Sequence, residues 1–141
     1  MRASLVICAL VVVCVAPAIQ ASRVMDRCSL AREMAQNGVP RDQLARWACI
    51  ADKQSNYHTD AVSPTNKDGF RSYGIFQISN QYWCYSAKEP SREVECRTVC
   101  EVFLEDDIGD SVMCARKIQE KQGWSAWPGC TESLPSIDDC F

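Results

Sequence analysis

The residues best suited to chemistry by type and spacing are the ten cysteines of this 141-residue chain. Cys8 and Cys14 lie in an apolar N-terminal run, and the other eight are spread over positions 28–140. A zinc-type site is disfavoured, because the chain has no Cys-x-x-Cys pair and His58 is its only histidine. An even set of cysteines behind a secretory leader is typical of disulfides. We therefore predict four disulfides, although spacing alone leaves their pairing open.

The N-terminal segment has the features of a secretory signal peptide. Arg2 precedes an apolar run that ends near Ala18 and is too short and wrongly flanked for a membrane span. Small residues place the cleavage after Ala18 or Ala21. We therefore expect residues 1–21 to be a signal peptide and residues 22–141 to be one secreted, extracellular domain.

The charge of the expected mature chain is acidic. The sequence has 15 basic and 18 acidic residues, and Arg2 is the only charged residue of the predicted leader. Such a chain lacks the positive field that draws proteins to nucleic acids or to anionic surfaces. We expect no nucleic-acid partner and no membrane partner.

Three helices are expected to position the remaining candidates. Helical spacing of apolar residues predicts the first over 26–36 and the second over 42–53, with Asp42 as its N-cap. The third is expected to begin at Asp106 or Asp107 and to end near Gly123. The second helix is predicted to have Leu44, Trp47, Ala48 and Ala51 on one face, and the third to carry the apolar residues Ile108, Val112, Met113, Ala115 and Ile118.

The helical period is lost between residues 55 and 78. Turn residues such as Ser63-Pro64 and Asp68-Gly69 precede Tyr73 and Ile75, which favour strands. We expect a small antiparallel sheet here, an irregular loop over 83–100, and short turns over 129–141. Helices on both sides of a small, disulfide-linked sheet make an α+β domain.

Two segments, residues 47–56 and 72–79, resemble the catalytic region of chicken-type (C-type) lysozymes. Four blocks near the ends of the domain, residues 25–34, 38–45, 122–127 and 134–141, are similar to those of fly digestive lysozymes. The resemblance implies a two-lobed fold, a monomer, and a cleft for a β-1,4-linked amino-sugar polymer. The cysteine order also matches the family, which implies the pairs Cys28–Cys140, Cys49–Cys130, Cys84–Cys100 and Cys96–Cys114.

The resemblance further implies that both catalytic carboxyl groups are missing. This chain has Gln54 where the family has a glutamic acid, and Ser72 where it has an aspartate. Lysozymes use one carboxylic acid to protonate the leaving oxygen and one carboxylate to stabilise or capture the sugar cation. Neither an amide nor a hydroxyl performs these steps. We therefore expect a lysozyme-like protein without muramidase activity.

Other carboxylates are weak substitutes for the missing pair. Asp52 lies roughly 200° around the helix from Gln54, on the other face. Asp60, Asp68 and Glu33 are further candidates, and we interpret all four as solvated surface charges. The alternative is a weakly active or rearranged lysozyme with a digestive or antibacterial role.

The family motif implies five groove positions. Aromatic rings stack on sugar faces and amides bond their hydroxyl and acetamido groups. Trp83 and Trp127 can equally be core residues beside Cys84 and Cys130, whereas Gln77 in an apolar strand needs polar partners. We expect an altered groove that binds peptidoglycan or chitin-derived oligosaccharides. The five positions are Gln77, Ser79, Tyr82, Trp83 and Trp127, with Ser79 in place of the usual asparagine.

Two departures from the family pattern affect this groove. Arg71 places a cation next to Ser72 in the sequence, and residues 128–130 form a shorter segment than in the fly proteins. The competing hypothesis is therefore an interaction protein that uses the fold as a disulfide scaffold, in a reproductive or α-lactalbumin-like role.

Residues 103–111 resemble the calcium loop of α-lactalbumins and of some C-type lysozymes. Glu105 and Asp110 could supply side-chain oxygens and Asp107 a carbonyl oxygen. However, Ser111 replaces a further aspartate of the binders, and acidic residues at a helix start also suit the helix dipole. We expect no cofactor, with calcium as the alternative.

Overall fold

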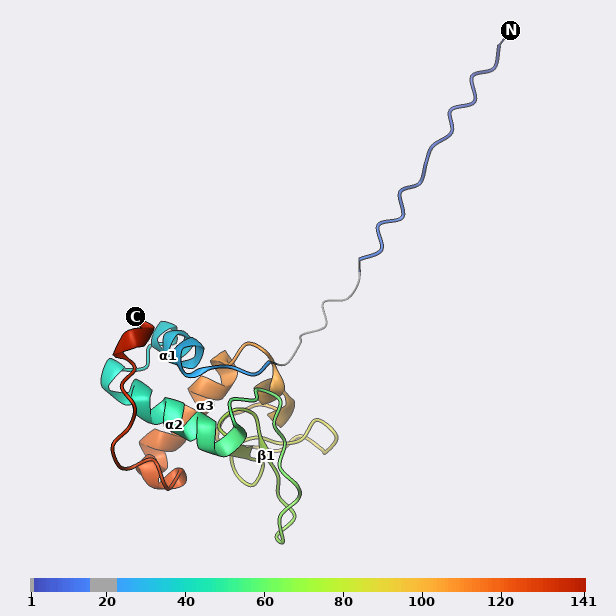
Figure 1. Ribbon diagram of the computed structural model, residues 1–141. Coiled ribbons are helices and arrows are strands. Elements are labelled where there is room, and N and C mark those ends of the chain that lie inside the picture. Colours follow the sequence, from blue (N-terminus) through green and yellow to red (C-terminus); the bar gives the residue numbers. More distant parts are fainter. Residues whose placement is uncertain (1, 16–22) are drawn as a thin grey trace.

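The structure is a computed structural model and describes residues 2–15 and 23–141. Residues 2–15 run as an exposed extended segment away from the folded domain (Figure 1). The described residues include no helix of the length and apolarity needed to cross a membrane. The predicted cleavage positions, Ala18 and Ala21, lie outside these described ranges.

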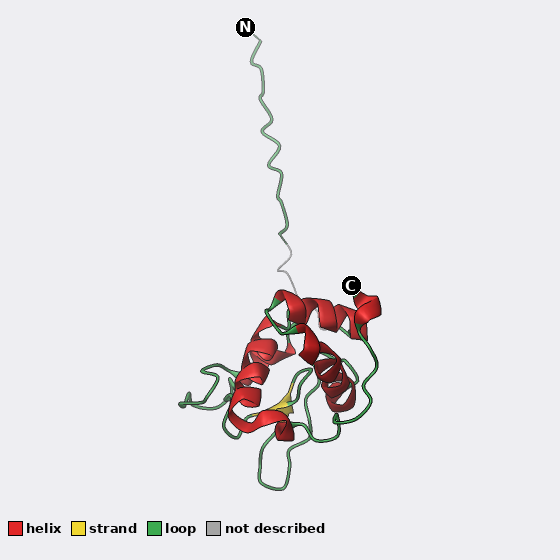
Figure 2. Ribbon diagram, turned by 90° about the vertical axis from the view of Figure 1, so that its left-hand side faces the viewer, coloured by secondary structure: helices red, strands yellow, loops and turns green. Residues whose placement is uncertain are grey.

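Three α-helices dominate the domain, and the sheet is very small (Figure 2). The helices are α1 (Arg27–Gln36), α2 (Leu44–Ser55) and α3 (Gly109–Gln122). Short 3-10 helices connect or extend them. These are η1 (Arg41–Gln43), η2 (Cys100–Leu104), η3 (Gly123–Ala126) and η4 (Asp138–Cys140).

The prediction of Asp42 as an N-cap is wrong. Asp42 lies inside η1, and α2 begins after it at Leu44 without a side-chain cap. The reason is local backbone bonding: the Gln43 N–H donates to the Pro40 carbonyl at 3.0 Å, and the Leu44 N–H donates to Arg41. The backbone therefore satisfies amide groups that a capping carboxylate would otherwise bond.

Helix α3 also begins later than predicted. The Asp107 carboxylate accepts the Gly109 N–H at 2.8 Å, which orders the chain just before the helix. Of the five apolar residues expected in this helix, Met113 is 70% exposed. Ile108, Val112, Ala115 and Ile118 are buried.

The sheet consists of β1 (Ser72–Tyr73) and β2 (Ile78–Ser79), which pair antiparallel. Ser72 lies opposite Ser79, and Tyr73 lies opposite Ile78. The connecting turn is closed by the Gln77 N–H, which donates to the Gly74 carbonyl at 3.0 Å. Gly74 is required here, because its φ is +79° and a Cβ would overlap the carbonyl oxygen of Phe103.

Trp47 forms the centre of the core. Its ring is fully buried and meets Phe76, Trp124 and Trp127 edge to face, with ring centroids 5.1 to 5.3 Å apart. The α+β prediction is confirmed, and so are all four implied disulfides. These are Cys28–Cys140, Cys49–Cys130, Cys84–Cys100 and Cys96–Cys114.

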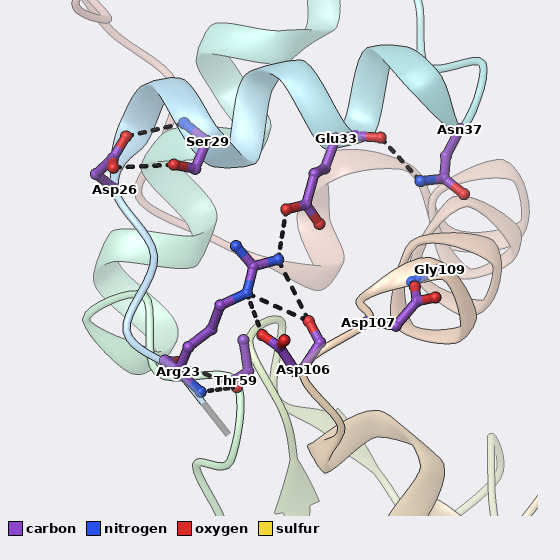
Figure 3. A network of polar contacts seen from close by, with 9 residues as sticks. All are labelled: Arg23, Asp26, Ser29, Glu33, Asn37, Thr59, Asp106, Asp107 and Gly109. Carbon is purple, nitrogen blue, oxygen red and sulfur yellow. Dashed lines mark hydrogen bonds and ion pairs between the residues drawn. The ribbon is translucent and has the colours of Figure 1, made fainter. Parts of the chain in front are cut away.

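Polar contacts fix the start of the domain to distant segments (Figure 3). The guanidinium of Arg23 forms ion pairs with Glu33 of α1 and with Asp106. Its backbone N–H donates to the Thr59 hydroxyl at 2.9 Å. Asp26 caps α1 by accepting the Ser29 N–H at 2.8 Å. We call this set, together with the Cys28–Cys140 disulfide and the Arg27–Asp139 ion pair, the terminal frame.

Candidate functional site

The hairpin over residues 72–79 is anchored by two side chains from other segments. The Ser55 Oγ, at the end of α2, lies 2.8 Å from the Ile75 carbonyl oxygen. The Trp127 indole N–H donates to the Phe76 carbonyl at 2.9 Å. Both carbonyls belong to the hairpin turn, so the end of α2, the hairpin and Trp127 meet at one place. This arrangement gathers most of the candidate residues.

Gln54 and Ser72, the two positions implied to be catalytic, are both half-buried in this region. Gln54 precedes Ser55 in the last turn of α2, and Ser72 is the first residue of β1. Ser63 fixes the Ser72 backbone through two hydrogen bonds. The Ser72 N–H donates to the Ser63 hydroxyl at 2.8 Å, and the Ser63 N–H donates to the Ser72 carbonyl at 2.9 Å. The site therefore holds rigid polar groups but neither a proton donor of carboxylic strength nor a negative charge at these two positions.

The four substitute carboxylates lie in environments unsuited to a general acid. Asp52, Asp60 and Asp68 are exposed. Glu33 is engaged by Arg23 in the terminal frame (Figure 3). A carboxyl that stays protonated near neutral pH must be shielded from water and free of a cation partner. None of the four meets both conditions.

The five groove candidates differ in what they offer a ligand. Tyr82 is 59% exposed, whereas Trp83 and Trp127 are only 7% and 6% exposed. The Gln77 amide donates to the carbonyls of Ala61 and Gly74 at 3.1 and 3.0 Å. Ser79 accepts the Gln81 N–H at 3.1 Å. Tyr82 thus presents a ring to solvent, while Gln77 and Trp127 are also structural.

Sequence reasoning missed the contribution of Ser55 and did not foresee where the Arg71 side chain lies. Ser55 is buried and polar. A serine on the apolar face of α2 needs a hydrogen-bond partner, and this position was the signal in the sequence for a structural role. The side chain of Arg71 donates from Nε to Thr65 Oγ1 at 2.8 Å and, with Tyr73, lines a hollow that does not include Ser72. Alternate residues of a strand face opposite ways. The Arg71 cation therefore lies across the strand from Ser72, not beside its hydroxyl.

Only one of the three calcium candidates, Asp107, has a side-chain partner among the described residues. The Asp107 carboxylate bonds Gly109, and Ser111 is 2% exposed with its hydroxyl donating to the Phe103 carbonyl at 3.4 Å. Within residues 2–15 and 23–141, the one close group of three metal-type side chains is Cys28, Asp139 and Cys140. Its two cysteines form a disulfide. Calcium binding by Glu105, Asp107 and Asp110 stays a prediction.

Comparison with known proteins gives consistent similarity over the whole domain. Residues 23–140 match the C-type lysozyme/alpha-lactalbumin family. The chain is 54% identical to Lysozyme P of Drosophila melanogaster over 144 aligned positions, which cover 100% of both chains. It is 50% identical to Lysozyme 1 of Musca domestica over 122 positions, covering 84% of this chain and 86% of that protein. Lysozyme c-1 of Anopheles gambiae is 36% identical, over 98% of this chain and 97% of the other.

Proposed function

Because the chain belongs to the C-type lysozyme/alpha-lactalbumin family, we propose that it is a secreted protein that binds peptidoglycan or chito-oligosaccharides without hydrolysing them. One observation carries this proposal: Gln54 and Ser72 occupy the positions that the family resemblance assigns to the two catalytic carboxyl groups. The remainder of the domain keeps the α+β fold and its four disulfides. Fold and chemistry are therefore separable here.

The two substitutions affect catalysis more than binding. A glutamine amide is nearly isosteric with a carboxylic acid and can still donate a hydrogen bond to a glycosidic oxygen, but it cannot transfer the proton. A serine hydroxyl cannot oppose the positive charge of the transition state. Loss of a positioned general acid typically costs about 100-fold to 10,000-fold in rate. Losing the carboxylate as well removes the second source of rate enhancement.

Tyr82 is the contact that most directly supports glycan binding. Its ring is 59% exposed, and its hydroxyl accepts a hydrogen bond from Gln81 at 3.0 Å, which orients it. An oriented, exposed aromatic ring suits the apolar face of a sugar. We therefore assign it the main stacking role, with Gln54 and Ser79 as polar contacts.

Secretion is part of the same proposal. The apolar leader and the four disulfides both suit export to an oxidising compartment. Cleavage after Ala18 or Ala21 would leave Arg23 and its bond to Thr59 within the mature protein. N-terminal sequencing of the secreted protein tests this point, and a retained leader would contradict it.

Binding and hydrolysis can be measured together. The wild-type protein is mixed with chitotetraose and with insoluble peptidoglycan, and both the bound fraction and newly formed reducing ends are measured. We expect binding without reducing ends, and a roughly threefold to tenfold weaker affinity for Tyr82→Ala. Phe141→Ala is the matched control, because Phe141 is 55% exposed and packs under Arg41 near the C terminus.

The outcome also decides between the alternatives. Reducing ends from the wild-type protein would indicate a weakly active lysozyme. Failure to bind either glycan would favour a disulfide scaffold for protein interactions. That second candidate is supported by the burial of Trp83 and Trp127, which leaves little of either ring for a sugar.

A further inference from the structure

A separate hollow lies on the face of β1 opposite Ser72. Its volume is about 480 Å³, within the range of roughly 300 to 1,000 Å³ that is usual for small-molecule sites. Arg71 and Tyr73 contribute from β1 and the residue before it, and Glu101 contributes from η2. Leu104 of η2, Asn80 after β2 and the loops around residues 65 and 88 complete the lining. It includes Val62, Thr65, Asn80, Ser86, Lys88 and Glu89.

Glu101 and Arg71 bring opposite charges to this hollow. The half-buried Glu101 carboxylate is held only by neutral donors, the Ser86 hydroxyl at 3.2 Å and the Ala87 N–H at 3.0 Å. Arg71 is oriented through its Nε bond to Thr65, which leaves its two terminal nitrogens for other partners. Among the ion pairs formed by the described residues, neither Arg71 nor Glu101 takes part. The hollow thus holds an oriented cation and an oriented anion that do not neutralise each other.

The same hollow has an apolar part. Tyr73 is 7% exposed, and Val62 and Leu104 also line the space. Burial, followed by the negative charge of Glu101, raises the pKa of the Tyr73 phenol, so its hydroxyl stays neutral near pH 7. Lys88 and Glu89 place a second cation and a second anion in the exposed part of the lining. One ligand can therefore meet positive, negative and apolar surface together.

We propose that this hollow is a second ligand site, specific for small zwitterions of the free amino-acid or short-peptide class. The ligand carboxylate bonds the terminal nitrogens of Arg71, and the ligand ammonium bonds Glu101. The ligand's apolar side chains lie against Tyr73 and Leu104. The ligand needs both a free amino end and a free carboxyl end. Blocking the carboxyl end would leave Arg71 without its partner, and blocking the amino end would leave Glu101 without its partner. The proposal does not depend on glycan binding across the strand.

The test compares one dipeptide with its two blocked forms. Isotope-labelled protein of the secreted length is titrated with alanyl-alanine to about 10 mM, with its N-acetyl form, and with its C-terminal amide, while amide NMR shifts are followed. We expect saturable shifts at Gly69, Asn80 and Lys88 with the free dipeptide. Each blocked form should bind at least roughly tenfold more weakly, since each loses one charge-assisted contact.

Variants assign each end of the ligand. Arg71→Gln should bind the free dipeptide and its amide equally, and Glu101→Gln should bind the free dipeptide and its N-acetyl form equally. Lys67→Gln and Glu93→Gln are controls, because both residues are exposed and neither lines the hollow. No saturable shift with wild-type protein, or equal binding of all three peptides to it, would overturn the proposal. Retained discrimination by both variants would also overturn it. These results leave the glycan measurements unaffected.

Discussion

The terminal frame and the hairpin over residues 72–79 are held by different kinds of contact. The terminal frame combines a disulfide with several ion pairs and a helix cap, so no single contact carries it. The hairpin is held by hydrogen bonds, which involve Ser55, Ser63, Trp127 and the Gln77 amide. The family chemistry, in contrast, depends on the two positions of Gln54 and Ser72. The fold is thus supported by many contacts, whereas the hydrolytic activity that we propose to be absent would depend on two side chains.

The largest effect on the terminal frame should come from its disulfide. We expect Cys28→Ser with Cys140→Ser to lower the free energy of unfolding by about 2–5 kcal/mol in urea denaturation. The control pair Cys84→Ser with Cys100→Ser closes a shorter loop, since its sequence separation is 16 rather than 112. In the chain-entropy model its effect is about 1–2 kcal/mol smaller. If the two double variants lose equal amounts of unfolding free energy, the Cys28–Cys140 disulfide does not stabilise the fold more than the Cys84–Cys100 disulfide does.

A smaller effect is expected at the hairpin. Ser55→Ala removes a buried hydroxyl whose Oγ lies 2.8 Å from the Ile75 carbonyl oxygen and 2.9 Å from that of Ala51, and the loss of this hydrogen bond should cost about 1–3 kcal/mol of unfolding free energy. It should also speed hydrogen exchange at Gln77, whose N–H closes the hairpin turn. Ser125→Ala is the matched control, because its hydroxyl bonds the Gln122 carbonyl at 2.8 Å in an exposed position. If Ser125→Ala lowers the unfolding free energy as much as Ser55→Ala does, burial of the Ser55 hydroxyl is not the reason for its effect.

Asp26→Ala removes the cap of α1 and should lower the free energy of unfolding by about 1 kcal/mol at pH 7. This loss should depend on pH. Hydrogen bonds from the Ser29 N–H and hydroxyl lower the pKa of Asp26 below its ordinary 3.8. Since the folded-state pKa is the lower one, this stabilisation is complete above the ordinary value and is lost as pH falls through the folded value. Urea titrations at several pH values measure it. A difference between wild type and variant that persists unchanged at pH 2 would exclude this mechanism.

The smallest expected effect concerns calcium. We predict that the melting temperature is the same with calcium and with a chelator, because the Asp107 carboxylate bonds Gly109 and Ser111 is a neutral, buried residue. A cation bound only by the folded state would have to raise the melting temperature. A chelator-sensitive transition would establish the calcium alternative.

The spacing of apolar residues predicted the existence of the helices better than their exact ends and exposed positions. Helical spacing placed all three α-helices, because their apolar faces repeat with the period of the helix. The start of α2 and the exposure of Met113 were not predictable in the same way. The former depends on the 3-10 turn after Pro40, and the latter on how α3 packs against its neighbours. The cysteine pairing came from family resemblance and not from spacing.

The candidate site was predicted as a set of residues but not as a geometry. Resemblance selected Gln54, Ser72 and the groove positions, whereas sequence could not show that Gln77 bonds two carbonyls of its own scaffold. It also could not place the Arg71 side chain, because strand alternation fixes a face only once the strand is known. Contacts between distant segments, such as Ser55 with Ile75, follow from tertiary packing.

The central proposal is that this lysozyme-family protein lacks hydrolytic activity because Gln54 and Ser72 stand at the positions of the family's catalytic carboxyl groups. The most direct measurement is the clearing of a bacterial cell-wall suspension from pH 4 to pH 8 by wild type and by the Gln54→Glu, Ser72→Asp double variant. The account predicts no clearing by wild type above a heat-inactivated sample, and clearing by the double variant. Clearing by the wild-type protein would contradict it.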